Sequence, residues 1–221
     1  MKQILIGAIA FTCILSACKK SDKKGSEPDK FMSTSPGSSW NYAFVDNTNA
    51  AANYNYTVTS SNSDTLINGR SYHKYAVSTG GTEYYNISGH DYYTYAALPA
   101  ELGGSHIENL YLKDNASAGT AWNQSYNVII NSIPITIQTT NTIAAVGLTR
   151  TVAGQTYTNV IQVNTSITPP AIPGLTLTSN ISYYYAPRVG MIENHIVVGI
   201  NGLGVTQDVN TQTTLTNATI L

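Results

Sequence analysis

Charge is the scarcest feature of this sequence. Only 10 % of its 221 residues are charged, with 11 Lys and Arg against 12 Asp and Glu, and the formal net charge is -1. A protein that binds nucleic acid needs a basic surface, and a charged disordered tail needs dense charge. The composition therefore excludes both classes, and we expect no nucleic-acid partner.

Cysteine is nearly absent as well. The chain has 2 Cys, Cys13 and Cys18, and both lie close to its N-terminus. The remainder has no thiol for a disulfide, a thiolate metal site or a nucleophile. Its stability must therefore come from a packed core alone, and we expect no cofactor.

Helical signals are also missing, whereas residues that favour strands abound. Thr occurs 28 times, Asn 21 times and Tyr 16 times. Apolar residues alternate with polar ones, as in Trp40, Tyr42 and Phe44, and this period of two is typical of half-buried strands. We expect strands over residues 40–44, 54–58, 65–67, 70–78, 82–88, 91–96, 107–112, 122–130, 133–145, 146–152, 157–167, 175–185, 189–200 and 203–214.

This number of strands limits the architecture. A dozen or so antiparallel strands exceed what a flat open sheet tolerates, so the sheet must curl or split. The predicted fold is all-β, either a single strongly curved antiparallel sheet in the form of a half-barrel or a two-layer β-sandwich. With no repeat and no second linker, residues 38–221 form one domain.

Turn residues predict some pairings. Asn68-Gly69 and Asn201-Gly202 are strong signals for two-residue hairpins. The second turn would place Val198 opposite Val205 and His195 opposite Asp208. A turn at Gly89-His90 would pair the flanking strands and place tyrosines on both faces of that hairpin. Its pairs would be Ile87 with Tyr92, Asn86 with Tyr93, Tyr85 with Thr94 and Tyr84 with Tyr95.

The N-terminus has the features of an export signal. A positive Met1-Lys2 start precedes an uncharged stretch of fourteen residues, Ile4–Ala17. At ~1.5 Å per residue this stretch is too short for the ~30 Å hydrocarbon core, which favours a signal peptide over a spanning helix. It ends in Leu15-Ser16-Ala17-Cys18, which resembles the lipobox of bacterial lipoproteins. The resemblance implies a signal peptide over residues 1–17 and acyl chains such as palmitate on Cys18.

Residues 18–37 are expected to form a lipidated flexible tether, because they are rich in Lys, Ser, Pro and Gly and nearly lack apolar residues. The Cys-Lys-Lys start is similar to lipoproteins of Bacteroidota. It implies an outer-membrane lipoprotein whose membrane partner is bound through Cys18. The periplasmic face and the cell surface both stay open.

The C-terminal half carries a second resemblance. Residues 154–163 and the run Tyr-Tyr-Ala-Pro-x-Val-Gly-Met-Ile over Tyr184–Ile192 resemble a pattern that recurs in uncharacterised envelope lipoproteins. Arg188 stands where their usual form has Gly. Some of these families resemble lipoprotein carriers in their curved sheet, which implies an apolar groove. Pro187 and Gly190 are expected to end one strand and begin the next.

No catalytic or metal signature is found. His106-x-Glu108 falls on one strand face and His90-Asp91 at a turn, but neither has the remaining ligands of a zinc set. The sequence has no nucleophile elbow, Walker loop or dinucleotide fingerprint. We therefore expect no enzyme, no catalytic residue and no metal. A hydrolase would need two acids or a His-acid pair that converge in a cleft.

The tyrosines offer better candidates. Amphipathic rings on a sheet can stack on sugars or line a lipid groove. Tyr84, Tyr93 and Tyr95 are the candidate ligand-contacting residues. Asp64-Thr65-Leu66 resembles the short sequence on which Bacteroidota attach O-glycans, which makes Thr65 a candidate site in a loop before the Asn68-Gly69 turn.

These observations together predict a lipid-anchored, non-catalytic envelope protein. It would bind an apolar or lipid-like ligand or serve a structural role in the outer membrane. The alternative is a surface glycan-binding or adhesin module that uses exposed tyrosines, and a hydrolase is the third hypothesis. A deep groove would favour the first hypothesis and a flat aromatic platform the second.

Overall fold

The computed structural model describes residues 30–97, 106–130, 133–168, 172–202 and 204–221. The strands within these residues are joined mostly by short turns, and one 3-10 helix follows the first of them. The elements are β1 (Ser39–Asp46), η1 (Ala50–Ala52), β2 (Tyr54–Ile67), β3 (Arg70–Val77), β4 (Thr82–Ser88), β5 (Asp91–Ala97), β6 (His106–Lys113), β7 (Ala121–Ile130), β8 (Ile133–Val152), β9 (Gln155–Thr168), β10 (Thr176–Ala186), β11 (Gly190–Gly202) and β12 (Val205–Thr219).

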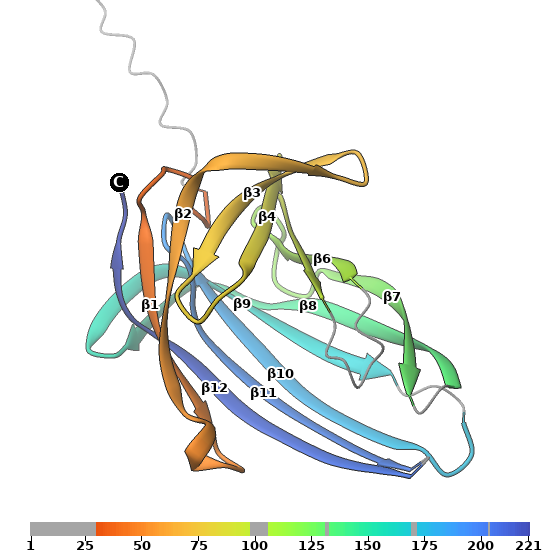
Figure 1. Ribbon diagram of the computed structural model, residues 1–221. Coiled ribbons are helices and arrows are strands. Elements are labelled where there is room, and N and C mark those ends of the chain that lie inside the picture. The colour runs from red at the N-terminus through yellow and green to blue at the C-terminus, as the bar shows by residue number, and fades with distance from the viewer. Residues whose placement is uncertain (1–29, 98–105, 131–132, 169–171, 203) are drawn as a thin grey trace, which may run out of the picture.

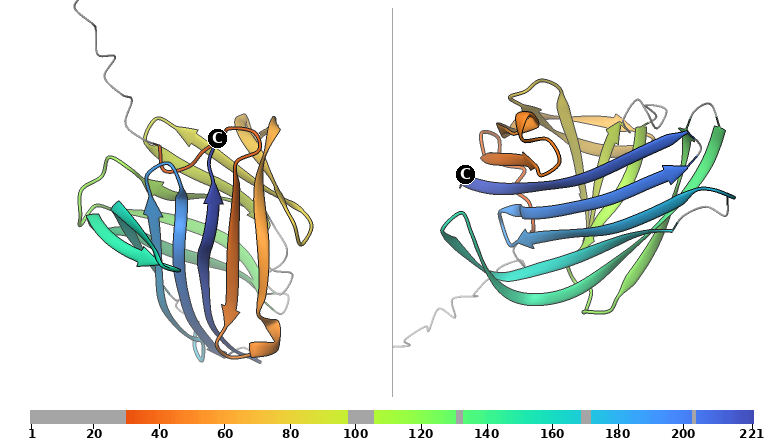
Figure 2. Two further views of the ribbon diagram at one scale, coloured as in Figure 1. Left: turned by 90° about the vertical axis from the view of Figure 1, so that its left-hand side faces the viewer. Right: turned by 90° about the horizontal axis from the view of Figure 1, so that it is seen from below.

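All twelve strands belong to one antiparallel sheet, in the order β6-β5-β4-β3-β2-β1-β12-β11-β10-β9-β8-β7. The first strand pairs with both β2 and β12, so the first and last strands lie side by side in the middle of the sheet. The sheet curls around one interior until it is nearly closed into a barrel (Figures 1 and 2). The all-β, strongly curved single sheet is thus confirmed, and the chain does not form the two-layer sandwich.

Side chains bridge the seam between the edge strands β6 and β7. Trp122 Nε1 donates a hydrogen bond of 2.8 Å to the Leu110 carbonyl, and Tyr126 donates one of 3.2 Å to Asn109 Oδ1. The amide of Gln124, oriented by its partners, accepts from the Leu110 N–H at 2.8 Å and donates to the Leu110 carbonyl at 3.0 Å. These groups replace the missing strand-to-strand ladder at the seam.

Two predicted hairpins are confirmed. Asn68 and Gly69 adopt φ values of 50° and 82°, and Ile67 pairs with Arg70 across them. At the Gly89-His90 turn, all four predicted pairs from Ile87–Tyr92 to Tyr84–Tyr95 are present. One face of that hairpin consequently lies inside the barrel and the other on its surface.

The prediction of a two-residue hairpin at Asn201-Gly202 is wrong. Gly202 pairs with Val205, so the chain reverses two residues further along than predicted. Gly204 adopts φ +75°, which makes the later turn available. Because the strand period is two, a turn displaced by two residues keeps the same residues inside. The hydrophobic pattern therefore does not distinguish the two registers.

The displaced turn changes every predicted pair between β11 and β12. Val198 lies opposite Val209 and His195 lies opposite Gln212. The predicted pairing of His195 with Asp208 is therefore wrong, and the two residues do not form a His-acid pair. His195 Nε2 instead lies 3.1 Å from Glu193 Oε1 on its own strand.

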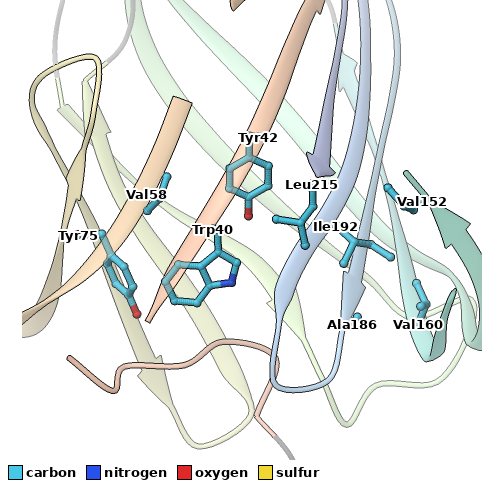
Figure 3. Close-up of a cluster of buried hydrophobic side chains, with 9 residues drawn as sticks. All are labelled: Trp40, Tyr42, Val58, Tyr75, Val152, Val160, Ala186, Ile192 and Leu215. Atoms are coloured by element: carbon cyan, nitrogen blue, oxygen red, sulfur yellow. The ribbon is translucent and has the colours of Figure 1, made fainter. Parts of the chain in front are cut away.

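The core follows the inner wall near one end of the barrel. Figure 3 shows nine buried side chains that converge there from strands across the sheet, among them Trp40, Tyr42 and Tyr75. Trp40 is 2 % exposed and its ring meets that of Tyr75 edge-on at 5.8 Å. A second buried cluster, with Tyr92, Leu112 and Ile143 among its members, continues the core around the wall.

In the described part of the chain, no helix is long and apolar enough to cross a membrane. The leader of residues 1–17, most of the tether and Cys18 lie outside the described residues.

Candidate ligand-binding site

The inward faces of the strands enclose a partly open cavity of ≈ 370 Å³. Side chains from one face of most strands reach it, because successive side chains point to opposite faces of a sheet. Aromatic or charged side chains come from β1, β2, β4, β6, β7 and β10, and polar ones come from β5, β8, β9 and β11. The lining residues are Phe31, Met32, Trp40, Tyr42, Tyr56, Val58, Glu83, Tyr85, Thr94, Ile107, Asn109, Tyr111, Tyr126, Thr139, Asn141, Thr165, Tyr183, Tyr185, Val189, Gly190, Met191 and Asn194.

Tyrosine dominates this wall. Rings of Tyr85 and Tyr111 meet edge-on at 6.0 Å, and Tyr111 approaches Tyr185 at 5.4 Å. Tyr85 and Tyr111 come from β4 and β6, which have only β5 between them, whereas Tyr185 comes from β10, far from both in the order of the sheet. The contact between Tyr111 and Tyr185 therefore crosses the interior. Such pairs add ~0.5–1.5 kcal/mol each beyond the area that they bury.

The segment before β1 packs into one end of the barrel. Phe31 is 8 % exposed, and its N–H donates a 3.0 Å hydrogen bond to the Tyr92 hydroxyl. The Tyr75 hydroxyl donates to the Ser33 carbonyl at 2.8 Å. Residues 31–37 thus belong to the folded domain, so the expectation of a tether that stays flexible to residue 37 is wrong there. The polar composition of this segment suggested flexibility, but the burial of Phe31 and the backbone hydrogen bonds to Tyr92 and Tyr75 hold the segment in place.

The Tyr-Tyr-Ala-Pro-x-Val-Gly-Met-Ile run forms the corner between β10 and β11. The Trp40 Nε1–H donates to the Val189 carbonyl at 2.7 Å, and the Tyr42 hydroxyl donates to the Met191 carbonyl at 3.0 Å. Gly190 adopts φ +93°, and a Cβ there would lie 3.2 Å from the Phe31 carbonyl oxygen. β10 ends before Pro187 and β11 begins at Gly190, as predicted. The corner holds the Phe31 segment against the cavity.

Among the described residues that line the cavity, Glu83 is the sole charged one. It lies on the same face of β4 as Tyr85, whose hydroxyl donates a 2.9 Å hydrogen bond to Glu83 Oε2. Burial raises the pKa of the Glu83 carboxyl, and the Tyr85 hydrogen bond opposes part of that rise. Within the described residues, no Lys, Arg or His forms an ion pair with Glu83.

The cavity tyrosines keep their protons. Burial raises the pKa of Tyr42, Tyr85, Tyr111 and Tyr185 well above the ordinary value. Burial also raises the pKa of Tyr126 to about 12. All of these hydroxyls are therefore neutral at physiological pH, and four of them donate to groups of the protein itself: Tyr42 to the Met191 carbonyl, Tyr85 to Glu83, Tyr111 to Met32 Sδ and Tyr126 to Asn109.

Tyr84, Tyr93 and Tyr95 lie on the outer face of the same hairpin, not in the cavity. The face of Tyr93 is covered by the Arg70 guanidinium at 3.7 Å from the ring centroid. Tyr95 stacks on His106 with centroids 5.2 Å apart. Stacking on a sugar needs an open ring face, so these two contacts compete with it. Ligand contact by the three tyrosines stays a prediction.

Two Tyr–carboxylate–Arg sites stabilise the outer surface. At the first, Arg70 Nε lies 3.0 Å from Glu108 Oε2 while the guanidinium covers Tyr93. At the second, the Arg150 guanidinium lies 3.5 Å from the centroid of Tyr184. Its Nε donates to Glu193 Oε2 at 2.6 Å. Each carboxylate is thus paired with a cation that rests on an aromatic face.

Ser60, His73 and Asp64 have the connectivity of a hydrolase triad. Ser60 Oγ lies 2.9 Å from His73 Nε2, and His73 Nδ1 lies 2.6 Å from Asp64 Oδ1. Ser60, however, is 2 % exposed and does not line the cavity. A nucleophile needs space for a substrate on its hydroxyl and donors for an oxyanion, so this arrangement lacks the access that catalysis requires.

The other predicted polar sites are scattered. His90 Nδ1 lies 2.5 Å from Asp114 Oδ1, and Asp91 accepts from Lys113 Nζ at 2.9 Å. His106 and Glu108 share the outer face of β6, but His106 stacks on Tyr95. In the described ranges, no group of three or more His, Cys, Asp or Glu could hold a metal ion.

Thr65 lies within β2 and pairs with Tyr72, so its predicted loop position is wrong. The strand continues to the turn because Asn68 and Gly69 alone supply the positive φ values that the reversal needs. Glycosylation of Thr65 stays a prediction. Lipidation of Cys18 falls outside the described residues.

Sequence reasoning missed Glu83 and the inner set of tyrosines. The predicted pairing of Tyr85 with Thr94 already placed Glu83 and Tyr85 on one face of the hairpin. That pairing did not say which face was inside, since both faces carry tyrosines. Glu83 itself pointed the other way, because a carboxylate is unusual on an inner strand face.

Fold and cavity together define a class, namely a single-sheet all-β protein that is nearly closed into a barrel and has a tyrosine-lined interior. No model of a known protein family matches the chain, and no curated protein matches it. The chain is similar to a crystal structure from Parabacteroides distasonis described as a "putative lipoprotein". The two are 12 % identical with a TM-score of 0.49, over 87 % of this chain and 100 % of that one. At this similarity, neither ligand nor activity carries over.

Proposed function

We propose that this chain is a lipid-anchored, non-catalytic lipoprotein of the bacterial outer membrane, and that its interior binds one small apolar or lipid-like ligand. The cavity of ≈ 370 Å³ carries the binding part of the proposal. Sites for small ligands are concave, mostly apolar and aromatic, with a few polar groups that orient the ligand. The lining rings with Glu83 and the interior amides have this composition.

The anchor part rests on the leader and on Cys18. The uncharged stretch Ile4–Ala17 and the small residues before Cys18 are typical of a signal that is removed once the cysteine thiol has been diacylated. Two or more acyl chains would give lasting attachment, because each buried CH₂ contributes ~0.8 kcal/mol. The domain would then remain close to the membrane that supplies apolar ligands.

Absence of catalysis is part of the same proposal. The Ser60 hydroxyl is enclosed, and Glu83 has no second acid or His among the lining residues that the structure describes. Two carboxyl groups, or a His and an acid, are the usual pair for the acid and base chemistry of hydrolysis on a bound substrate. Binding without turnover agrees best with this set of side chains.

Tryptophan fluorescence tests ligand binding directly. The chain has 2 Trp, and Trp40 lines the cavity. In a Trp122→Phe variant, Trp40 is the remaining reporter, and a bromoalkane that enters the cavity quenches it on contact. We expect 6-bromohexanol to quench this variant of the full chain along a saturable curve.

A cavity-filling pair of variants provides the control. Thr139 lines the cavity, whereas its neighbour Thr140 points outward and donates to Asn123 Oδ1. Thr139→Phe should weaken binding by about tenfold or more, and Thr140→Phe should leave it within about twofold. Circular dichroism melting verifies that both variants fold. Linear quenching with no saturation in any variant would overturn the binding function.

A further inference from the structure

The outer surface shows how this protein satisfies a carboxylate beside a tyrosine. Glu193 and Glu108 are each bound by an Arg whose guanidinium also covers a tyrosine ring. The ring distances are 3.5 Å for Arg150 on Tyr184 and 3.7 Å for Arg70 on Tyr93. A guanidinium over a ring gains from the ring quadrupole and from the carboxylate together.

The cavity repeats two of these three components. Glu83 is a carboxylate among tyrosine rings, and the Tyr85 hydroxyl lies 2.9 Å from it. Of the described residues that line the cavity, none is a Lys, Arg or His. Within the described part of the chain the inner site thus has no cation of its own, although both outer sites have one.

We infer that the cavity binds an organic cation, an amine or quaternary ammonium on a short apolar body, whose charge lies between Glu83 and the faces of the surrounding tyrosines. The inference rests on the proposed function and names the chemical class of its ligand. Aromatic rings with a nearby carboxylate are a general solution for binding ammonium groups, because the ring faces are negative and displace water from the cation.

Size restricts the body of this cation. A cavity of ≈ 370 Å³ lies at the low end of the range for small-molecule sites, ~300–1,000 Å³. The apolar part therefore fits a short chain or a single ring rather than a complete phospholipid. Met32, Val58 and Ile107 supply apolar walls for it.

Glu83 has to be ionised for this pairing. The titratable groups that face it are the hydroxyls of Tyr42, Tyr56 and Tyr75 from β1 to β3, together with Tyr85 from its own strand. Burial raises the pKa of each hydroxyl, so they stay neutral near pH 7. A change of cation affinity between acidic and neutral pH consequently reports on Glu83.

Three probes that share one bromohexyl chain test the inference in the Trp122→Phe form of the full chain. They are 6-bromohexyltrimethylammonium, 6-bromohexanol and 6-bromohexanoate. At pH 8 we expect the cation to bind at least about tenfold tighter than the alcohol, with hexanoate the weakest. When Glu83→Gln is added, the affinity for the cation should fall by about tenfold, and the affinity for the alcohol should change by less than about twofold.

Glu108→Gln is the matched control, because it neutralises a carboxylate of the outer site and should leave cation affinity unchanged. Cation binding should also weaken as the pH falls from 8 to 4, except in Glu83→Gln. Saturable binding of the alcohol or hexanoate as tightly as the cation would overturn the inference and leave the proposed function standing. Failure of all three probes to saturate would overturn both.

Discussion

The Tyr85 hydroxyl donates a hydrogen bond of 2.9 Å to Glu83 Oε2, and the two residues lie on the same face of β4. This bond directs the carboxylate into the interior of the barrel rather than toward solvent. It satisfies one acceptor of the carboxyl group, and the described lining residues include no counter-ion for the charge. An acid in this position weakens the empty fold, because its charged form loses hydration.

The pH dependence of stability should therefore depend on Glu83. Its pKa is raised in the folded state, chiefly by burial, so the native protein holds this proton to higher pH than the unfolded chain. The stability that this extra proton binding contributes is fully present below the pKa of Glu83 in the unfolded chain, ~4.3. It is lost as the pH rises through the pKa of Glu83 in the folded protein. Glu83→Gln should remove that loss.

Urea unfolding at several pH values measures this effect. The free energy of unfolding of Glu83→Gln relative to the original protein should grow from pH 4 upward and then level off. Glu108→Gln, on the outer surface, should not show this growth. An offset for Glu83→Gln that is independent of pH would contradict the burial of an ionised Glu83.

The β10–β11 corner should respond in opposite directions to two substitutions. Arg188 adopts φ +67°, a conformation that is costly for any residue with a Cβ. Arg188→Gly should raise the free energy of unfolding by ~0.5–1 kcal/mol, after allowing for the entropy that glycine loses. Gly190→Ala should lower it by ~1–3 kcal/mol, since φ is positive and the Phe31 carbonyl is close. Chemical denaturation checks both, and equal signs would contradict the corner geometry.

The Ser60–His73–Asp64 arrangement should be inert. Because the Ser60 hydroxyl is enclosed, a fluorophosphonate probe that reacts with activated serines should not label the folded protein. Ser60→Ala should cost ~1 kcal/mol through the lost hydrogen bond to His73. Mass spectrometry that finds the label on Ser60 would contradict a purely structural role.

The anchor predicts a defined mass for the protein from its native host. Removal of residues 1–17 and acylation of Cys18 should give a chain that starts at a lipid-modified Cys18 and partitions into detergent. Cys18→Ala should abolish the lipid mass and the partitioning. A free Cys18 thiol, or a leader still attached, would contradict the anchor.

Local rules predicted the turns well where only one turn was available. The Gly89-His90 hairpin formed with its predicted register because its flanking strands had no competing glycine nearby. At Asn201-Gly202 a second glycine, Gly204, offered another reversal, and the later one formed. Alternation of apolar residues could not decide between them, since both place the same face inside.

The cavity could not be predicted from the same patterns. Tyr84 and Tyr85 alternate on one strand, and both faces of the hairpin bear tyrosines, so the inner face was not evident. Which face is inside depends on the curvature of twelve strands and on Phe31, whose burial is set by contacts with Tyr92. Such long-range packing leaves little trace in local sequence.

A crystal of the full chain soaked with 6-bromohexyltrimethylammonium tests the central claim most directly, because bromine is located by its anomalous scattering. The account predicts a bromine peak inside the cavity, with the ammonium beside the Glu83 carboxylate and within ~6 Å of a tyrosine ring centroid. A peak on the outer face over Tyr84, Tyr93 and Tyr95 while the cavity stays empty would contradict it.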